Sequence, residues 1–199
     1  MKIILIGCGV AILVLLAGLP IAYLNWPAPV PVSAAIEEGA EIGGAFELQD
    51  HHGQTVTEDT FKGRWTLVFF GFTHCPDICP TTLSHVASLL DGLGDMAEQV
   101  QPLFITLDPE RDTPAILAEY AAFFDPRILG LAGSAEQTRQ VADAYSVYFK
   151  KVNMGDTYTL DHTTTLYLMS PDGTFKRHYS EQMPADAMAQ DIAGLLDAG

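Results

Sequence analysis

Two cysteines and one histidine are the residues of this sequence whose types and spacing best suit chemistry. Cys75 and Cys79 are separated by three residues, and His162 follows much later in the chain. Two thiolates and one imidazole suit Cu(I) and can also hold Cu(II), whereas structural zinc normally has a fourth ligand. Cys75, Cys79 and His162 are therefore candidate copper ligands, and the two cysteines are a candidate redox pair. The two thiolates alone would be equally consistent with a simple disulfide.

The two cysteines lie between a predicted strand and a predicted helix. Residues 65–72 read WTLVFFGF, an apolar run typical of a strand buried on both faces. The loop 73–79 follows, and a helix is expected from Pro80, with apolar residues spaced along one face. Free backbone N–H groups and the helix dipole at such a junction stabilise a thiolate over a thiol. We therefore expect both sulfurs to ionise readily.

Strands and helices alternate through the rest of the chain. Further strands are expected at 45–50, 54–57, 102–107, 128–131, 147–152, 157–160, 164–169 and 174–179. Further helices are expected at 115–124, from Ser134 to about residue 145, and at 184–196. This order, closed by a hairpin and a helix, predicts an α/β sandwich of the thioredoxin type. Thioredoxins carry a cis proline beside the cysteine pair, where this chain has His162, just before an apolar strand. Asp161 is a candidate for orienting the imidazole through a hydrogen bond, although the adjacent residue of an extended strand normally points the other way.

The amino-terminal segment has a different composition from the rest of the chain. Ile3 to Leu24 contains no charged residue, and a helix of that length spans about 33 Å, enough to cross a bilayer core. We expect an uncleaved transmembrane helix over residues 1–24, with a cleaved signal peptide as the alternative. A proline-rich linker at 25–42 would then join it to a domain at 43–199. Lys2 places that domain in the periplasm or another extracytoplasmic space, tethered to the cytoplasmic membrane.

The charge of the chain excludes several partners. Its 199 residues carry 25 acidic and 10 basic side chains, a net charge of −15. Such a surface repels phosphate backbones, which argues against nucleic acid, and it gives no electrostatic attraction to anionic lipid. The three cysteines stand at 8, 75 and 79, so the globular part holds one close pair. This is not the framework of a small disulfide-stapled domain.

Other polar residues have structural interpretations. His74 is expected at the surface or behind the ligands, and His51 and His52 are expected to face solvent on a polar turn. The loop 108–114 reads DPERDTP, and we expect it to cap a helix, with Arg111 paired to a nearby acid.

Three stretches of the sequence carry a family resemblance. FTHCPDICP, LDPERDTP and DHTTTLYLMSPDG, in this order behind an apolar amino terminus, resemble the Sco/SenC family of copper-binding proteins. The resemblance runs from about residue 43 to residue 196. It implies a membrane-tethered thioredoxin fold that binds copper through Cys75, Cys79 and His162. It also implies a copper chaperone that delivers copper to, or helps assemble, the dinuclear CuA centre in the copper-bearing subunit of cytochrome c oxidase.

Two other functions are consistent with the cysteine pair. A thiol-disulfide oxidoreductase would keep the cysteines of the oxidase copper site reduced, and it would not need His162. A peroxidase would need one attacking and one resolving cysteine, for which a proline-flanked close pair is a poor match. In an oxidising compartment, the first two functions both require a separate electron donor to reduce Cys75 and Cys79.

Overall fold

The computed structural model describes residues 42–198. The expected transmembrane helix and nearly all of the proline-rich linker lie outside these residues. Within them, no helix has the length and apolar character needed to cross a membrane.

A seven-stranded sheet forms the centre of the domain, in the order β2-β1-β5-β4-β3-β8-β9. Its strands are β1 (Glu47–Asp50), β2 (Thr55–Thr57), β3 (Trp65–Gly71), β4 (Val100–Thr106), β5 (Leu129–Ala132), β8 (Leu166–Met169) and β9 (Phe175–Tyr179). Every residue of β3 is buried, and the strand is central in the sheet, since β4 pairs with it in parallel on one side and β8 antiparallel on the other. The apolar run that predicted a central strand is thereby confirmed.

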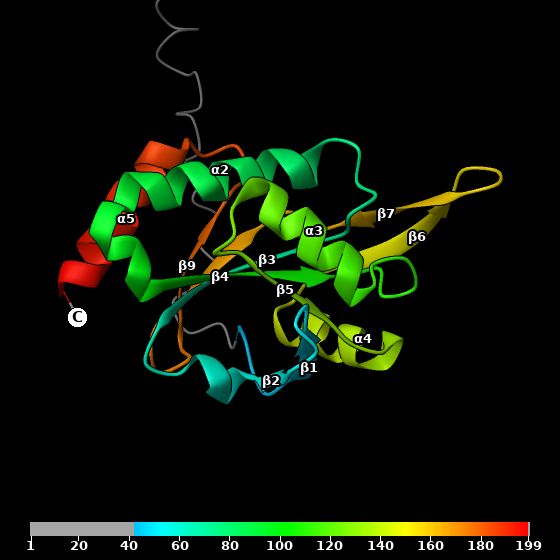
Figure 1. Ribbon diagram of the computed structural model, residues 1–199, viewed down its shortest axis with the longest axis horizontal. Helices are drawn as coiled ribbons and strands as arrows, with labels where there is room; N and C mark the ends of the chain where they lie inside the picture. Colours follow the sequence, from blue (N-terminus) through cyan, green and yellow to red (C-terminus); the bar gives the residue numbers. More distant parts are fainter. Residues whose placement is uncertain (1–41, 199) are drawn as a thin grey trace, which may run out of the picture. The chain divides into compact units, whose positions relative to one another are not determined.

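Helices cover both faces of the sheet, as expected for a mixed α/β sandwich. They are α2 (Ile78–Leu93), α3 (Pro114–Phe124), α4 (Ala135–Ala144) and α5 (Ala185–Ala198), with short 3-10 helices η1 (Glu58–Phe61) and η2 (Gly94–Gln99). Figure 1 shows α2, α3 and α5 on one side of the central strands and α4 on the other. The crossovers β3-α2-β4 and β4-α3-β5 join parallel neighbours, which places their helices on one face.

Helix α2 begins two residues earlier than the sequence indicated, and this places Cys79 in its first turn. Pro80 is accommodated there because the first N–H groups of a helix have no partner within the helix. The predicted apolar stripe is confirmed, since its members are all buried: Leu83, Val86, Leu89, Leu90 and Leu93.

The predicted starts of α3 and α4 are confirmed by their caps. The Thr113 side chain accepts a hydrogen bond from the backbone N–H of Ile116, and Pro114 is the first residue of α3. The Ser134 side chain accepts from the N–H of Gln137, whose own side chain accepts from the N–H of Ser134. Both arrangements satisfy N–H groups that the helix itself leaves unpaired.

Two hairpins belong to the main sheet and a third stands apart from it. Strands β6 (Phe149–Asn153) and β7 (Tyr158–His162) pair only with each other among the described residues, and this ribbon extends to one side in Figure 1. The β1–β2, β6–β7 and β8–β9 hairpins join the strands expected at 45–50 and 54–57, at 147–152 and 157–160, and at 164–169 and 174–179. His162 pairs with Phe149 and ends β7. The pairing runs two residues further than the predicted strand end at 160. The next strand, β8, begins at Leu166 and pairs with β3, so the expected place of His162 shortly before an apolar strand of the sheet is confirmed.

Candidate metal centre

The cysteine loop joins the end of β3 to the start of α2. The backbone N–H of Cys75 donates to the carbonyl oxygen of Phe72 at 3.2 Å, which turns the chain back toward the strand. The N–H of Cys79 donates to the Sγ atom of Cys75 at 3.4 Å. Both cysteines are free thiols; Cys75 is half-buried and Cys79 is fully buried. The two sulfurs therefore sit over the first turn of a helix, where N–H groups stabilise negative charge.

His162 completes the site from the β6–β7 ribbon. Its Nε2 atom lies 3.8 Å from Sγ of Cys79. The donor atoms of Cys75, Cys79 and His162 all lie within 4.8 Å of one another. The imidazole packs edge-on against the Phe72 ring, with 5.7 Å between the ring centroids. The structure thus brings together the three residues that the sequence singled out.

A backbone carbonyl orients the imidazole. The Nδ1 atom of His162 lies 2.8 Å from the carbonyl oxygen of Thr163. A carbonyl oxygen can only accept, so Nδ1 carries the proton and the lone pair of Nε2 faces the sulfurs. Asp161, which was a candidate for orienting the ring, is exposed, and the hydrogen bond of Nδ1 goes to Thr163 instead, so that prediction was wrong. Residues 161 and 162 point to opposite faces of β7, as neighbours in a strand do.

The two thiols have opposite electrostatic environments. A hydrogen bond from the Cys79 thiol, helped by backbone N–H groups, outweighs burial and lowers the pKa of Cys75 to about 3. The same hydrogen bond, together with burial, raises the pKa of Cys79 above that of an ordinary thiol. Cys75 is therefore the thiolate of the metal-free site, and Cys79 shares its proton with it.

Gly71, the last residue of β3, leaves the space that Cys79 occupies. A Cβ atom at this position would lie 2.7 Å from Sγ of Cys79 and 2.9 Å from Cε2 of Phe104. Both distances are shorter than a van der Waals contact, so no side chain fits. Sequence reasoning missed this residue, although a glycine ending an apolar strand just before the cysteine loop signals such a close approach.

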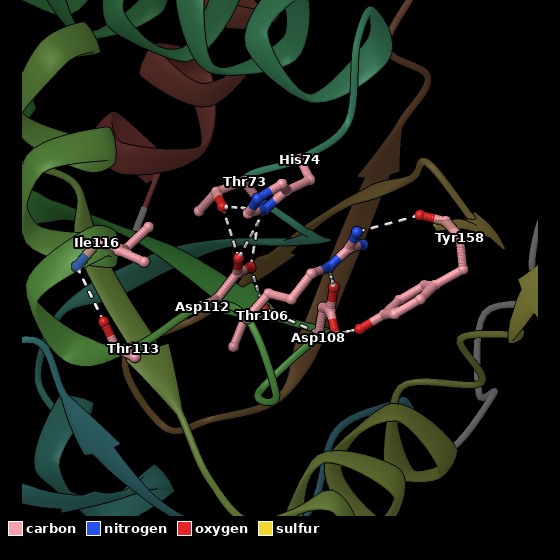
Figure 2. Close-up of polar contacts among 9 residues, drawn as sticks. Thr73, His74, Thr106, Asp108, Asp112, Thr113, Ile116 and Tyr158 are labelled. Atoms are coloured by element: carbon pink, nitrogen blue, oxygen red, sulfur yellow. Dashed lines mark hydrogen bonds and ion pairs between the residues drawn. The ribbon is translucent and has the colours of Figure 1, made fainter. Parts of the chain in front are cut away.

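The second sequence motif holds the cysteine loop through Asp112. Asp112 is buried and accepts hydrogen bonds from the backbone N–H of Thr73 at 3.0 Å and from its hydroxyl at 2.5 Å (Figure 2). It also accepts from the hydroxyl of Thr106 at 2.6 Å. The helix cap expected in this loop is Thr113, which begins α3, while Asp112 binds the cysteine loop. The polar loop thus positions the residues that precede Cys75.

The same motif holds the histidine ribbon through Asp108. Its carboxylate is buried, pairs with Arg111, and accepts from the hydroxyl of Tyr158 at 2.7 Å (Figure 2). Arg111 also donates to the carbonyl oxygen of Tyr158 at 3.1 Å, and its guanidinium lies 3.8 Å from the centroid of that ring. The predicted pairing of Arg111 with a nearby acid is confirmed. Because Tyr158 begins the strand that His162 ends, this cluster fixes the ribbon to the domain.

The remaining histidines stand outside the ligand set. Nδ1 of His74 lies 3.1 Å from the Thr73 hydroxyl and its side chain is 51% exposed, as expected for a residue behind or beside the ligands. His51 was expected to face solvent, and this was wrong: it is half-buried, and its Nδ1 accepts from the N–H of Gly130 at 3.0 Å. His52, its neighbour, is exposed as expected. The turn packs against β5, a contact that local sequence does not reveal.

The donor set fits a three-coordinate soft metal. Metal bonds to imidazole nitrogen and thiolate sulfur of about 2.0 to 2.3 Å separate three trigonal donors by roughly 3.5 to 4 Å. The separation of 3.8 Å between Cys79 Sγ and His162 Nε2 is in this range. The third donor, Sγ of Cys75, belongs to the more accessible of the two cysteines of the site and needs only a small approach to the other donors.

Comparison with known proteins gives consistent matches. The SCO1/SenC family model matches residues 34–197. The mitochondrial SCO2 homolog of Bos taurus is 44% identical over 164 residues, which cover 79% of this chain and 61% of that protein. The chain therefore spans less than two thirds of the length of this relative.

Solved structures match the described domain as well. The structure of Bradyrhizobium japonicum ScoI with copper bound is 43% identical, with a TM-score of 0.72, over 76% of this chain and 97% of that one. BsSco, a member of the Sco family of cytochrome c oxidase assembly proteins with an identified disulfide switch, is 25% identical, with a TM-score of 0.64, over 80% of this chain and 95% of that one. The thioredoxin-like α/β fold of the Sco proteins is thus the fold of this domain. By its matched residues and its fold, this chain belongs to the SCO1/SenC family.

Proposed function

We propose that this chain binds copper as cargo through Cys75, Cys79 and His162. The observation that carries the proposal is the convergence of two sulfurs and one imidazole nitrogen, all within 4.8 Å of one another. This donor set suits Cu(I) and accepts Cu(II), and the related Bradyrhizobium japonicum ScoI holds copper.

The unequal burial of the donors suits transfer rather than permanent storage. Cys79 is fully buried, whereas Cys75 and His162 are only partly covered. Three protein ligands leave a position on the metal that a ligand from a partner can occupy. An incoming thiolate would displace the accessible Cys75 first, so that copper passes through a mixed complex.

The destination that we propose is cytochrome c oxidase. The chain would deliver copper to, or help assemble, the CuA centre, with the copper-bearing subunit of the oxidase as its partner. Membership of the family supports this, since BsSco belongs to the Sco family of cytochrome c oxidase assembly proteins. An oxidase-producing host that lacks this chain should accumulate oxidase without CuA, and the wild-type chain should restore the centre. Normal CuA content without the chain would contradict this destination.

We also propose that residues 1–24 anchor the protein in the cytoplasmic membrane as a single-pass helix, with the domain in the periplasm or another extracytoplasmic space. The uncharged segment from Ile3 to Leu24 supports this. In fractionated cells the full chain should be extracted from membranes by detergent and not by carbonate. Protease added to the outside of spheroplasts should degrade its domain. Protection from that protease would contradict the orientation.

Copper binding is tested by titrating the reduced full-length chain in detergent with Cu(I) against a competing chelator. The wild type should bind about one equivalent. His162→Ala should weaken binding at least tenfold, because a nitrogen donor is lost, while the matched variant His178→Ala should bind like the wild type. Failure of the wild type to bind, or unchanged affinity in His162→Ala, would overturn the three-ligand site.

The state of the thiols is also compatible with the alternative function, that of a thiol-disulfide oxidoreductase. Cys75 is an accessible thiolate and Cys79 a buried thiol, as an attacking and a resolving cysteine should be. Cys75 would attack a disulfide of the partner to form a mixed disulfide. Cys79 would then displace the second partner thiol, leaving Cys75–Cys79 oxidised and the partner reduced by two electrons. Full oxidase assembly by His162→Ala, with loss in Cys75→Ser, would favour this role over copper delivery.

A further inference from the structure

Asp112 places a buried negative charge beside the cysteine loop. Its side chain is 0% exposed and accepts hydrogen bonds from three donors, namely the N–H and hydroxyl of Thr73 and the hydroxyl of Thr106 (Figure 2). The Thr106 hydroxyl itself accepts from the backbone N–H of Asp108 at 2.9 Å, so its own proton is directed at Asp112. Each of these groups stabilises the carboxylate.

No lysine or arginine neutralises this carboxylate within the described domain. The acids that pair with lysine or arginine there are Asp59, Asp91, Asp108, Glu110, Asp125 and Asp191. The nearest cationic candidate is the half-exposed His74, whose Nδ1 lies 3.7 Å from Oδ1. The carboxylate of Asp112 is therefore stabilised by hydrogen bonds from neutral groups, whereas the charge of the neighbouring Asp108 is balanced by Arg111. A charge held in this way acts over longer distances in a buried site than in water.

The carboxylate is tied to residues that lie beside both sulfurs. Thr73 is two residues before Cys75 in the same loop. Thr106, the other residue that donates to Asp112, lies opposite Gly71 in the pairing of β4 with β3. The sulfur of Cys79 packs against Gly71.

The influence of this charge reaches the buried thiol. Asp112 contributes to the raised pKa of Cys79, after the larger effects of the neighbouring Cys75 and of burial.

The charge of a copper complex at this site depends on the oxidation state of the metal. Two thiolates and a neutral imidazole give a complex of charge −1 with Cu(I) and of charge zero with Cu(II). A nearby fixed negative charge disfavours the more negative complex. We propose, on the basis of the copper-binding function above, that Asp112 shifts the preference of the Cys75–Cys79–His162 site from Cu(I) toward Cu(II).

The test compares the affinities of the reduced full-length chain for Cu(I) and Cu(II), together with the reduction potential of bound copper. Asp112→Asn should lower the affinity for Cu(II) relative to Cu(I) about tenfold, which for a one-electron couple is a rise of about 59 mV. The matched control is Asp125→Asn, a buried aspartate at the other end of α3 that pairs with Arg127. Its ratio of affinities should equal that of the wild type.

A second variant should change the reduction potential of bound copper in the opposite direction. Thr106→Val removes a hydroxyl that offsets the charge of Asp112 but leaves the charge in place, so the potential should fall. A purely structural role would weaken both oxidation states together and leave their ratio unchanged in both variants, which would overturn the proposal. If Asp112→Asn does not fold, a rise or no change of potential in Thr106→Val overturns it. Absence of copper from the wild type would overturn the copper function and this proposal together, whereas an unchanged ratio in a copper-loaded Asp112→Asn overturns this proposal alone.

Discussion

The backbone N–H of Cys79 donates a hydrogen bond to the Sγ atom of Cys75, at 3.4 Å. This contact adds to the hydrogen bond that the Cys79 thiol donates to Cys75, which is the main reason that the two cysteines differ chemically. Cys75 takes the negative charge at the accessible edge of the site, and Cys79 holds the proton in the interior. A metal ion must displace that proton, so copper uptake should release it to solvent.

Cys75 should react with alkylating reagents at unusually low pH. Its pKa is lowered to about 3, so the thiolate is present throughout the range from pH 5 to pH 8. The rate constant for iodoacetamide should be nearly constant across this range, whereas an ordinary thiol with a pKa near 8.5 slows about tenfold per pH unit. Peptide mapping should find the label on Cys75. In Cys79→Ala the main hydrogen bond is lost and the rate at pH 5 should fall. An ordinary thiol profile in the wild type would contradict the assignment.

Gly71→Ala should disturb the metal site and the fold together. The added Cβ would lie 2.7 Å from Sγ of Cys79, and overpacking of this kind costs about 1 to 3 kcal/mol. Denaturant unfolding should show that loss, and the copper affinity should fall because Cys79 is displaced. Gly194→Ala, in α5 with no atom within 4 Å of the new Cβ, is the matched control and should not be destabilised. Equal stability of the two variants would contradict the packing described here.

The order of elements and the three candidate ligands could be predicted from the sequence because their signals are local. The apolar run of β3, the stripe of α2 and the cap residues Thr113 and Ser134 depend on residue type and spacing alone. These signals do not record contacts between distant segments. The half-burial of His51 depends on Gly130, and it could not be seen from its polar turn.

The orientation of His162 and the role of the DPERDTP loop could not be predicted either, because both depend on contacts that residue type and spacing do not indicate. A backbone carbonyl orients the imidazole, and a carbonyl has no signature in sequence. Asp108 and Asp112 resembled cap residues of a polar loop, but their partners Tyr158 and Thr73 lie 50 and 39 residues away. Partners so far apart in the sequence can be identified only once the pairing of the strands is known.

Tyr158→Phe should loosen the ribbon that carries His162. The variant removes the hydroxyl that donates to the buried Asp108 at 2.7 Å. We expect a loss of about 1 kcal/mol in the free energy of unfolding and faster amide exchange in β6 and β7. Tyr148→Phe, on an exposed tyrosine that precedes the same ribbon, should change neither quantity. Identical exchange rates in both variants would show that the hydroxyl does not hold the ribbon.

His51 should make the domain less stable in mild acid. Burial, and after it the neighbouring His52, lowers the pKa of His51. The Nδ1 atom of His51 must also stay unprotonated to accept from the N–H of Gly130. The unfolded chain then binds more protons than the folded one as the pH falls through about 6.5, so the contribution of His51 is complete above that pH and is lost below it.

Thermal melts at pH 7.5 and pH 5.5 check this dependence. Asn at position 51 can keep an acceptor for the Gly130 N–H without titrating, so His51→Asn should lose less stability between the two pH values than the wild type. His52→Asn removes only the smaller of the two effects on His51, so its loss of stability should lie between those of the wild type and His51→Asn. A wild-type melting temperature that falls no more than that of His51→Asn would contradict the role of His51.

The most direct test of the copper site is metal analysis with absorption spectroscopy on the full-length chain, purified under reducing conditions and loaded with Cu(II). We predict one copper per chain and a thiolate-to-Cu(II) charge-transfer band in the wild type. The band should be lost or strongly shifted in His162→Ala and should keep its wild-type form in His178→Ala. A wild type without copper, or a His162→Ala variant with the stoichiometry and band of the wild type, would contradict a site built from Cys75, Cys79 and His162.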